Sequence, residues 1–379
     1  MIWEELAAAL AVAAADRRSR WFPAVAAVPR HVLIPAWFYR DQPTGRWRAW
    51  DGSEDNQEWL RCTYADKTRV TRAGVLHADH ASPDDRPAGR STSSATQPSL
   101  TVRMLRLAGL RRGDAICDMG TGSGYSAALL CHRFGDSAVT SIDVDPYLTK
   151  AAAERLAAIG YYPRIHACDA TGPLPGEFDA IIASFSVRPC PASWLTALRP
   201  GGRLVFVIGG TYLVVVADKR PDGGATGRVD SYGAMFMPAR HGPDYDTPDW
   251  PPQDGTAGQR TARYPVINLE ESSELCSAFG LAAPGVHARF TITRQGASEL
   301  RLWDQAGSWA IATGHDTSPA VVQQAGERRL WDELEAVMDM WVPRWSFPWY
   351  RAHADIDPDG TIHLATPDGH RLTVGDAHG

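Results

Sequence analysis

The sequence lacks the patterns that mark several common classes of protein. Its six cysteines include no C-x-x-C pair and its twelve histidines form no H-E-x-x-H motif, so neither a disulfide framework nor a metal site is predicted. No apolar run approaches the roughly 18–20 residues that would cross a bilayer. Positive charge is also scarce, because 38 Lys and Arg face 44 Asp and Glu, and this balance argues against a nucleic-acid partner.

One stretch instead predicts a ligand site. Residues 115–125 form a short apolar run that ends in Asp118 and is followed by three glycines spaced by two, Gly120, Gly122 and Gly124. An Ala- and Leu-rich segment comes next, so the pattern predicts a strand, a tight turn and a helix. Glycine suits this turn because the backbone adopts positive φ and approaches a ligand closely.

Two ligand classes fit the glycine turn. Residues 122–127 match the dinucleotide pattern G-x-G-x-x-A, whereas an acid two residues before G-x-G-x-G, here Asp118, is typical of S-adenosylmethionine enzymes. A carboxylate beside the turn would repel a pyrophosphate but suits a sulfonium and an ammonium. The second class is therefore favoured.

Strands and helices alternate after the turn, over 138–142, 147–159, 164–168, 178–184, 192–198 and 203–208. This alternation predicts an α/β fold with a doubly wound, mostly parallel sheet whose ligand lies at the carboxyl ends of the strands. Asp143 and Asp169 follow two successive strands. There they could accept hydrogen bonds from ribose hydroxyls and meet the adenine edge of a cofactor.

A hydroxyl-rich segment, residues 91–100, precedes the glycine turn. We expect a helix N-terminus there, because hydroxyl residues cap helices and Pro98 suits a first turn. Such a site would suit an anion, for example a substrate carboxylate. Near the other end of the chain, four tryptophans fall between 331 and 349; their helical spacing is typical of a core stripe, but their density also suits a peptide-binding groove.

Several segments together resemble the protein-L-isoaspartate O-methyltransferase family. They are, in chain order, Val-Pro-Arg-His at 28–31, Tyr-Ala-Asp at 64–66, residues 94–100, the glycine motif and the Gly-Gly pair at 201–202. The Thr-Gln-Pro at 96–98 is the part specific to the family. Thr96 stands where the family normally has serine, and Ser99 where a histidine is common. The family's repair enzymes lack anything like residues 240–379.

The resemblance implies a class I S-adenosylmethionine-dependent methyltransferase with a C-terminal α+β extension. It implies that the cofactor binds Asp118, Gly120, Thr121, Gly122, Ser123, Gly124, Asp143, Asp169 and Ala170. Thr96 and Ser94 would be the catalytic residues that orient the acceptor carboxylate. A carboxylate with a pKa near 4 is already ionised at pH 7, so no general base is required.

The departures from the family pattern favour its C-terminally extended branch, which accompanies ribosomally made peptide natural products such as graspetides and some lanthipeptides. That branch methylates an aspartate of the precursor, and the ester then closes to an aspartimide. We therefore expect a peptide carboxyl O-methyltransferase of this kind. General isoaspartate repair, a non-catalytic binding protein on the same fold and, more distantly, a nicotinamide-dependent oxidoreductase are the alternatives.

These interpretations divide the chain into four parts: a helical and loop region that forms part of the substrate site (1–90), the cofactor-binding core (91–238), a linker (239–263) and a C-terminal α+β domain for peptide recognition (264–379). Glu4 and Glu5 stand where a secretory signal would carry positive charge, so we expect a cytoplasmic protein. The expected partner is a peptide or protein bearing an aspartate or isoaspartate, with no nucleic acid and no membrane. The sequence predicts no oligomeric state.

Overall fold

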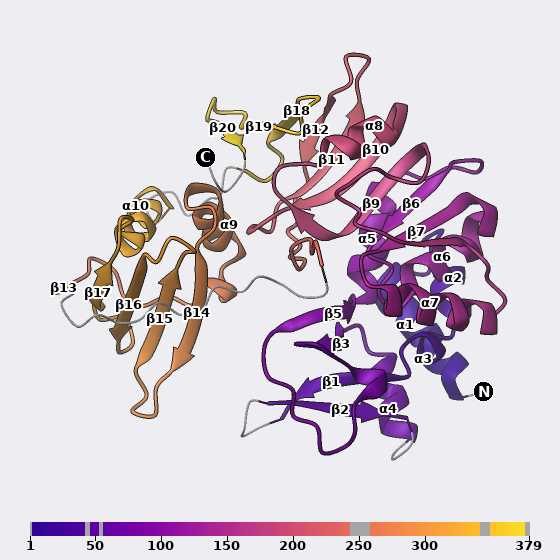
Figure 1. Ribbon diagram of the computed structural model, residues 1–379, viewed down its shortest axis with the longest axis horizontal. Coiled ribbons are helices and arrows are strands. Elements are labelled where there is room, and N and C mark those ends of the chain that lie inside the picture. Colours follow the sequence, from indigo (N-terminus) through magenta and orange to yellow (C-terminus); the bar gives the residue numbers. More distant parts are fainter. Residues whose placement is uncertain (1, 42–45, 53–55, 243–257, 342–348, 376–379) are drawn as a thin grey trace.

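The computed structural model describes residues 2–41, 46–52, 56–242, 258–341 and 349–375. Their strands form three sheets: a central sheet of ten strands and two sheets of five strands. Figure 1 shows the N-terminal five-stranded sheet below the central sheet and the C-terminal one at the left. No helix in the described ranges is both long and apolar enough to cross a membrane.

The parallel part of the central sheet contains the strands that the alternation predicts. Its order is β10-β9-β6-β7-β8, with β6 (Ile116–Met119), β7 (Val139–Asp143), β8 (Arg164–Ala167), β9 (Phe178–Val187) and β10 (Leu198–Ile208). The helices that follow these strands are α6 (Tyr125–Phe134), α7 (Pro146–Ala158) and α8 (Ala192–Ala197), with a 3-10 turn η2 (Asp136–Ala138). The predicted doubly wound α/β fold is confirmed, but the sheet as a whole is mixed rather than mostly parallel, with four parallel and five antiparallel strand pairings.

Neighbouring residues of one strand enter two different cores, because side chains alternate along a strand. Ile116 of β6 packs in the cluster that contains residues of α1 (Ile2–Ala15), α2 (Phe22–Ala27), α5 (Pro98–Leu107) and α6. Cys117 and Met119 pack in a second cluster with Trp194 of α8. Burial on both faces explains why residues 178–184 read as an almost continuous apolar run.

The other edge of the central sheet is antiparallel. β11 (Val214–Lys219) and β12 (Ala225–Val229) form a hairpin, and β18 (His353–Ile356), β19 (Ile362–Ala365) and β20 (Arg371–Val374) continue the sheet from β12. The sequence placed residues 264–379 in one separate domain, but the sheet pairing assigns 353–374 to the core. Alternate apolar residues of these strands are fully buried in the second cluster, and this burial attaches them to β12.

Residues 259–341 form a C-terminal module. Its antiparallel sheet contains β13 (Gln259–Thr261), β14 (His287–Ile292), β15 (Ser298–Trp303), β16 (Trp309–Gly314) and β17 (Val321–Ala325). The module also contains η3 (Leu269–Glu271), α9 (Ser273–Ala282) and α10 (Leu330–Trp341). Trp331, Leu334 and Met338 of α10 are completely buried in its core, so this stripe offers no groove. Trp345 and Phe347 lie outside the described residues.

The N-terminal region contains more sheet than predicted. β1 (Ala36–Arg40), β2 (Trp47–Asp51), β3 (Arg69–Ala73), β4 (Leu76–His77) and β5 (Ser91–Ala95) pair with one another, beside α3 (Arg30–Leu33), α4 (Asn56–Thr63) and η1 (Ala78–His80). The sequence predicted a helical and loop region there. The predicted helix with Pro98 in its first turn is confirmed, but the sequence was wrong in taking the hydroxyls of residues 91–95 as its caps. They belong to a strand paired with β3, and α5 begins only at Pro98.

Candidate functional site

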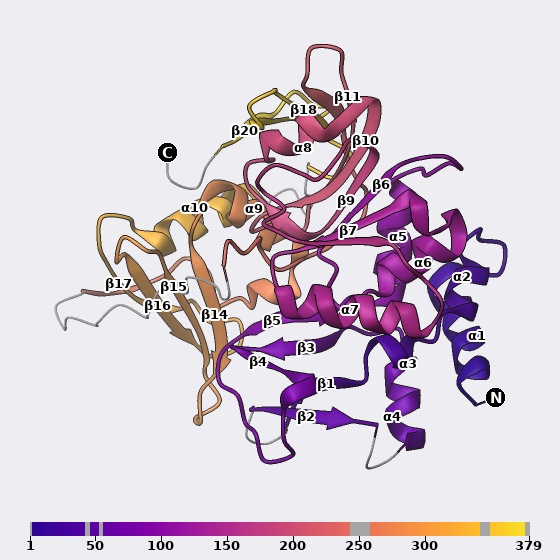
Figure 2. The same cartoon turned by 45° about the vertical axis from the view of Figure 1, so that its right-hand side comes forward.

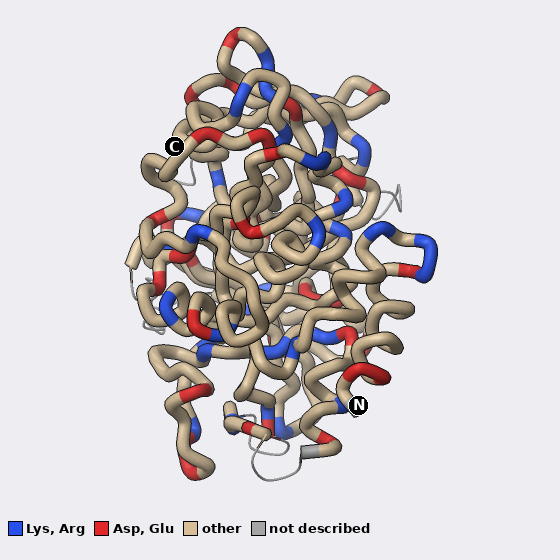
Figure 3. The backbone as a smooth tube through the Cα atoms, turned by 90° about the vertical axis from the view of Figure 1, so that its right-hand side faces the viewer, with Lys and Arg blue, Asp and Glu red and all other residues tan. Residues whose placement is uncertain are grey.

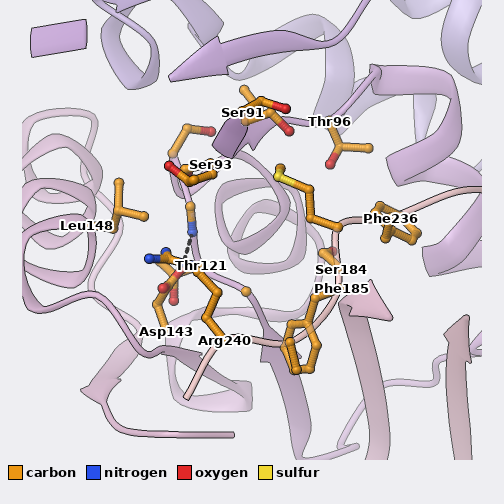
Figure 4. A pocket seen from close by; sticks show the side chains of 18 of the residues that line it. Ser91, Ser93, Thr96, Thr121, Asp143, Leu148, Ser184, Phe185, Phe236 and Arg240 are labelled. Atoms are coloured by element: carbon orange, nitrogen blue, oxygen red, sulfur yellow. Dashed lines mark hydrogen bonds between the residues drawn. The ribbon is translucent and has the colours of Figure 1, made fainter. Parts of the chain in front are cut away.

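A cavity of about 590 Å³ lies between the glycine turn, strand β5 and residues 235–240. Figure 4 shows Thr121, Asp143 and Arg240 on one side of it, with Ser91, Ser93 and Thr96 opposite. The cavity is lined by most of the residues predicted from the sequence, namely Ser94, Thr96, Gly120, Thr121, Gly122, Ser123, Asp143, Asp169 and Ala170. Asp118 and Gly124 do not line it.

The glycine turn requires glycine for two reasons. Gly120, Gly122 and Gly124 have φ values of 86°, 50° and 82°, which side chains disfavour. A Cβ atom on Gly124 would also lie 3.3 Å from side-chain atoms of Ala152 and Leu156 of α7. The backbone N–H groups of Gly120 and Thr121 donate to the carbonyl of Ile142, at 2.7 and 3.1 Å, and fix the turn to the end of β7.

Asp143 ends β7 at the cavity wall. Its Oδ2 atom accepts from the backbone N–H of Gly122 at 2.9 Å, and its Oδ1 atom accepts from that of Asp145 at 3.0 Å. Burial raises the pKa of this carboxyl, while the two N–H groups oppose the shift. Each carboxylate oxygen can accept a further hydrogen bond, so Asp143 can bind ligand hydroxyls without releasing the turn.

Asp118 lies behind the turn rather than in the cavity. It accepts hydrogen bonds from the hydroxyls of Ser126 and Ser141, and the Ser141 hydroxyl is 2.7 Å from that of Thr121. Burial raises the pKa of Asp118 to about 6. The carboxyl therefore reaches the cavity through Ser141 and Thr121, and it supports the turn from below.

Asp169, which follows β8, lines the cavity next to Ala170. It accepts from the backbone N–H and the hydroxyl of Thr171, at 2.8 and 2.7 Å, and lies 3.0 Å from Nδ1 of His241. Burial alone would raise the pKa of Asp169, but His241 and Thr171 outweigh it and lower the pKa. Asp169 thus presents a fixed anion at the end of β8.

The Thr96 segment is held from behind by two residues in motifs that the sequence singled out. Asp66 accepts from the backbone N–H of Ser99 at 2.8 Å and from the side-chain amide of Gln97 at 3.1 Å. Arg30 is completely buried, and burial lowers its pKa to about 10. It donates to the backbone carbonyls of Thr63, Ala65, Lys67 and Thr96. These contacts give Thr96 a fixed position at the cavity wall.

Sequence reasoning missed the third wall of the cavity, residues 235–240. The sequence placed the end of the core at residue 238 and a linker from residue 239, because residues 238–263 have no periodicity. Ser186 of β9 donates from its backbone N–H to the carbonyl of Met237 at 2.8 Å, and Ala239 donates to the carbonyl of Ser186 at 2.9 Å. The Nη2 atom of Arg240 then lies 3.8 Å from Oδ2 of Asp145. Residues 243–257 of the predicted linker lie outside the described ranges.

The cavity fits S-adenosylmethionine. A Cβ atom on Gly120 would lie 3.4 Å from the Phe185 ring, so glycine leaves space at the turn for a closely approaching ligand. Asp143 supplies acceptors for ribose hydroxyls, and the edge formed by Asp169 and Ala170 is suited to an adenine ring. Leu148 and Phe185 add apolar surface, which a flat ring prefers.

Comparison with known proteins agrees with this geometry. The family model described as Protein-L-isoaspartate(D-aspartate) O-methyltransferase (PCMT) matches residues 79–242. The protein-L-isoaspartate O-methyltransferase of Brucella anthropi is 30% identical over 164 residues, which cover 41% of this chain and 73% of the relative. That of Pyrococcus horikoshii is 31% identical over 161 residues, which cover 40% and 70%.

Other matches cover less of the relative or show only a distant likeness. Protein-L-isoaspartate O-methyltransferase 1 of Nitrosospira multiformis is 33% identical over 153 residues, which cover 39% of this chain. The chain spans 64–65% of the length of this and two further curated relatives. A solved protein-L-isoaspartate O-methyltransferase aligns with 99% of both chains at 15% identity and a TM-score of 0.47.

The segment that the family model matches, residues 79–242, contains the glycine turn. It also contains all of the residues that line the cavity except Thr68, Val70 and Glu270. Two relatives are at least 30% identical to this chain over at least 70% of their own length. The chain belongs to the protein-L-isoaspartate O-methyltransferase family, whose members are carboxyl O-methyltransferases that use S-adenosyl-L-methionine, and it has the class I methyltransferase fold.

Proposed function

We propose that this protein is an S-adenosylmethionine-dependent O-methyltransferase that methylates an aspartyl side-chain carboxylate of a ribosomally made, modified peptide. The ester then closes to an aspartimide. The observation that carries the proposal is the single cavity in which the hydroxyl wall of Ser94 and Thr96 faces the glycine turn and Asp143. The C-terminal module of the protein lies outside residues 79–242, the segment that the family model matches. This additional module supports a specific peptide substrate rather than damaged proteins in general.

The chain's own residues position the reactants. Bound S-adenosylmethionine would supply the electrophilic methyl group. Thr96 and Ser94 donate hydrogen bonds to one oxygen of the acceptor carboxylate and leave the other oxygen directed at the turn. No residue has to remove a proton, because the acceptor is already ionised at neutral pH. Arg30 and Asp66 keep the Thr96 segment rigid, and rigid alignment is the main source of rate in such a displacement.

Mass spectrometry tests this proposal directly. The enzyme is incubated with cofactor and with candidate crosslinked precursor peptides. We expect a peptide that gains one methyl group and then loses methanol as the aspartimide closes. The matched control is the variant Thr96→Val, which keeps the side-chain shape but removes the hydroxyl. Unchanged peptide masses with an enzyme that binds S-adenosylhomocysteine normally would contradict the proposal.

General repair of isoaspartyl proteins is the second candidate, and the family match over 79–242 favours it. Short isoaspartyl peptides of unrelated sequence separate the two. Efficient methylation of all of them would establish repair, whereas methylation restricted to one kind of modified peptide would exclude it. A non-catalytic binding role remains the third alternative, and calorimetry that detected no affinity for S-adenosylhomocysteine would favour it.

A further inference from the structure

The C-terminal module reaches the cofactor cavity through one residue. Glu270, in the 3-10 turn η3, lines the cavity together with the hydroxyl wall and residues 235–240, and among the described residues it is the one member of the module that does so. Asp143 and Asp169, the other two acids of the lining, belong to the cofactor end of the cavity. Glu270 is therefore an acid that cofactor binding does not explain.

Helix α9, which follows η3, anchors this part of the module to the core. The Nη1 atom of Arg188 donates to the carbonyl of Gly280 at 2.7 Å. A Cβ atom on Gly280 would collide with the carbonyl oxygen of Gly210, so glycine permits a close approach to the core here. Figure 2 shows α9 as the helix of the module that lies next to the central sheet. These contacts fix the position of η3 relative to the cavity.

A chain of hydrogen bonds joins α9 to the third wall of the cavity. The hydroxyl of Ser277, a completely buried residue of α9, accepts from the backbone N–H of Tyr212 at 2.9 Å. The carbonyl of Tyr212 accepts in turn from the backbone N–H of Ala234 at 3.0 Å. Ala234 directly precedes Met235, which lines the cavity. The module and the segment 235–240 therefore share one support at Tyr212.

The carboxylate of Glu270 can bind a ligand without disturbing the turn. The turn is held through the backbone, because the N–H of Glu270 donates to Oδ1 of Asn268 at 3.1 Å. Glu270 is exposed, and its carboxylate has neither a hydrogen bond nor an ion pair with another residue of the described ranges. Figure 3 shows basic and acidic residues interspersed along the backbone, so a charged group of a substrate responds mainly to the residues that it meets locally.

Other residues of the lining suit a long cationic side chain. Met235, Phe236 and Met237 line the same cavity, and Met235 is 46% exposed. Lysine and arginine lay their methylene groups on apolar surface and keep the charged end in a polar environment. Methionine adapts to such a stem because its side chain is unbranched and flexible. The cavity thus offers an apolar surface for the stem and an acid for the charge.

We infer that Glu270 is a specificity-determining residue that selects peptides with a lysine or arginine beside the methyl-accepting aspartate. Its carboxylate attracts the cation of that side chain and repels an acidic residue at the same place. The module then takes part in substrate selection through a residue of the cavity itself. This inference rests on the proposed function and narrows its substrate class.

A purely structural role of Glu270 makes a different prediction. Acids near a helix N-terminus stabilise the helix, and Glu270 and Glu271 both precede α9. Glu271 does not line the cavity, and its carboxylate accepts from Nδ2 of Asn268 at 3.1 Å. Glu271→Lys is therefore the matched control, because it makes the same change of charge at the same end of α9 and leaves the cavity as it is.

The test measures peptide binding separately from methyl transfer. Three fluorescein-labelled peptides contain the same central aspartate, with Lys, Gln or Glu on both sides of it. Fluorescence anisotropy, with S-adenosylhomocysteine present, should show the Lys peptide binding most tightly and the Glu peptide most weakly. We expect about 3–10-fold between these two at low salt, since exposed charge pairs are individually modest. Added salt should reduce the difference.

The variants assign the preference to one residue. Glu270→Lys should reverse the order of the three affinities, Glu270→Gln should bring them within about twofold of one another, and Glu271→Lys should leave the order unchanged. Calorimetry with S-adenosylhomocysteine should give unchanged affinity for all three variants, which shows that they are folded. Equal affinities of the three peptides for the wild type, or no detectable binding of any, would overturn the inference. The same loss of preference in Glu270→Lys and Glu271→Lys would overturn it too.

The outcomes also distinguish the two proposals. If the Lys peptide is preferred through Glu270 but no peptide is ever methylated, the proposed function fails and the role of Glu270 stands. If crosslinked precursors are methylated by the wild type and by Glu270→Lys with the same kcat/KM, the role of Glu270 is wrong and the proposed function stands.

Discussion

Among single residues, Asp118 leads to a prediction about stability and pH, because burial raises its pKa from 3.8 to about 6. Between those values the folded protein keeps a proton that the unfolded chain has already released. The contribution of Asp118 to stability therefore falls as pH rises through this window, by roughly 3 kcal/mol in full. Asp118→Asn should flatten the pH dependence of the unfolding free energy between pH 4 and 6, as measured by urea denaturation. The control Asp84→Asn, at an exposed loop position, should leave the profile as it is in the wild type.

The second prediction for a single residue concerns the hydroxyl of Thr96. Thr96→Val should lower kcat by about 10–100-fold, because a hydrogen bond to a charged group contributes about 1.5–3 kcal/mol. Affinity for S-adenosylhomocysteine should not change, since Asp143 and the glycine turn are untouched. Thr96→Ser restores the hydroxyl and should restore most of the rate. Steady-state kinetics and calorimetry check both points, and a fully active Val variant would remove Thr96 from the mechanism.

Among the structural elements, the segment 235–240 leads to a prediction about cofactor binding. Arg240 lies near Asp145, and His241 contacts Asp169, so the segment is attached to the ends of β7 and β8. Burial alone would raise the pKa of Asp145, but His77 and backbone N–H groups outweigh it and lower the pKa to about 2. Asp145 thus stays charged at any pH above about 4, and the attachment should weaken only as pH falls towards 2.

Arg240→Ala should accordingly weaken S-adenosylhomocysteine binding at pH 7 by about 5–30-fold, since a buried charged contact is lost. Hydrogen exchange of residues 231–242 should become faster in the same variant. Arg240→Lys, which keeps the charge, should have an affinity and an exchange rate between those of the wild type and the Ala variant. Unaltered affinity and exchange in the Ala variant would show that the Ser186 pairing alone holds the segment.

The elements also show what sequence patterns can and cannot predict. β6 to β10 were predictable because each is a buried apolar run followed by a turn signal, and the ligand acids stand at strand ends by topology. β5 was not, because Ser-Thr-Ser-Ser-Ala resembles a helix cap locally and becomes a strand only by pairing with β3. Arg240 could not be predicted as a wall of the site, since nothing in a proline-rich stretch indicates that Ser186 will pair with it.

For the whole molecule, the module is inserted between β12 and β18, and this topology makes a testable prediction about the C-terminal segment. If residues beyond 264 were an independent domain, removing 349–379 would leave the cofactor core intact. In the structure Ile356, Ile362, Leu364 and Val374 are fully buried against that core. Each contributes about 1.5–3 kcal/mol, comparable in sum to the whole stability of a typical domain.

The truncated chain should therefore lose cooperative unfolding and cofactor binding together, although residues 349–375, the part of the removed segment that the structure describes, do not line the cavity. Thermal unfolding with and without S-adenosylhomocysteine measures both. The matched control is Ile292→Ala, at a residue that is 70% exposed, which should change the Tm by no more than about 2 °C. A truncated protein that still binds the cofactor and unfolds cooperatively would contradict the topology.

The pairing of β12 with β18 has a further consequence for how this chain emerges from the ribosome. Thr226 and His353, which are in contact across the two strands, are 127 positions apart in the sequence. At about 5–20 residues per second, roughly 6–25 s of translation separate them. For that time β12 is an open strand edge on a nascent polypeptide, and open edges recruit strands from other chains. Slower elongation through the module should therefore increase aggregation of newly made protein, whereas the finished molecule, with β12 covered by β18, should be insensitive to the same conditions.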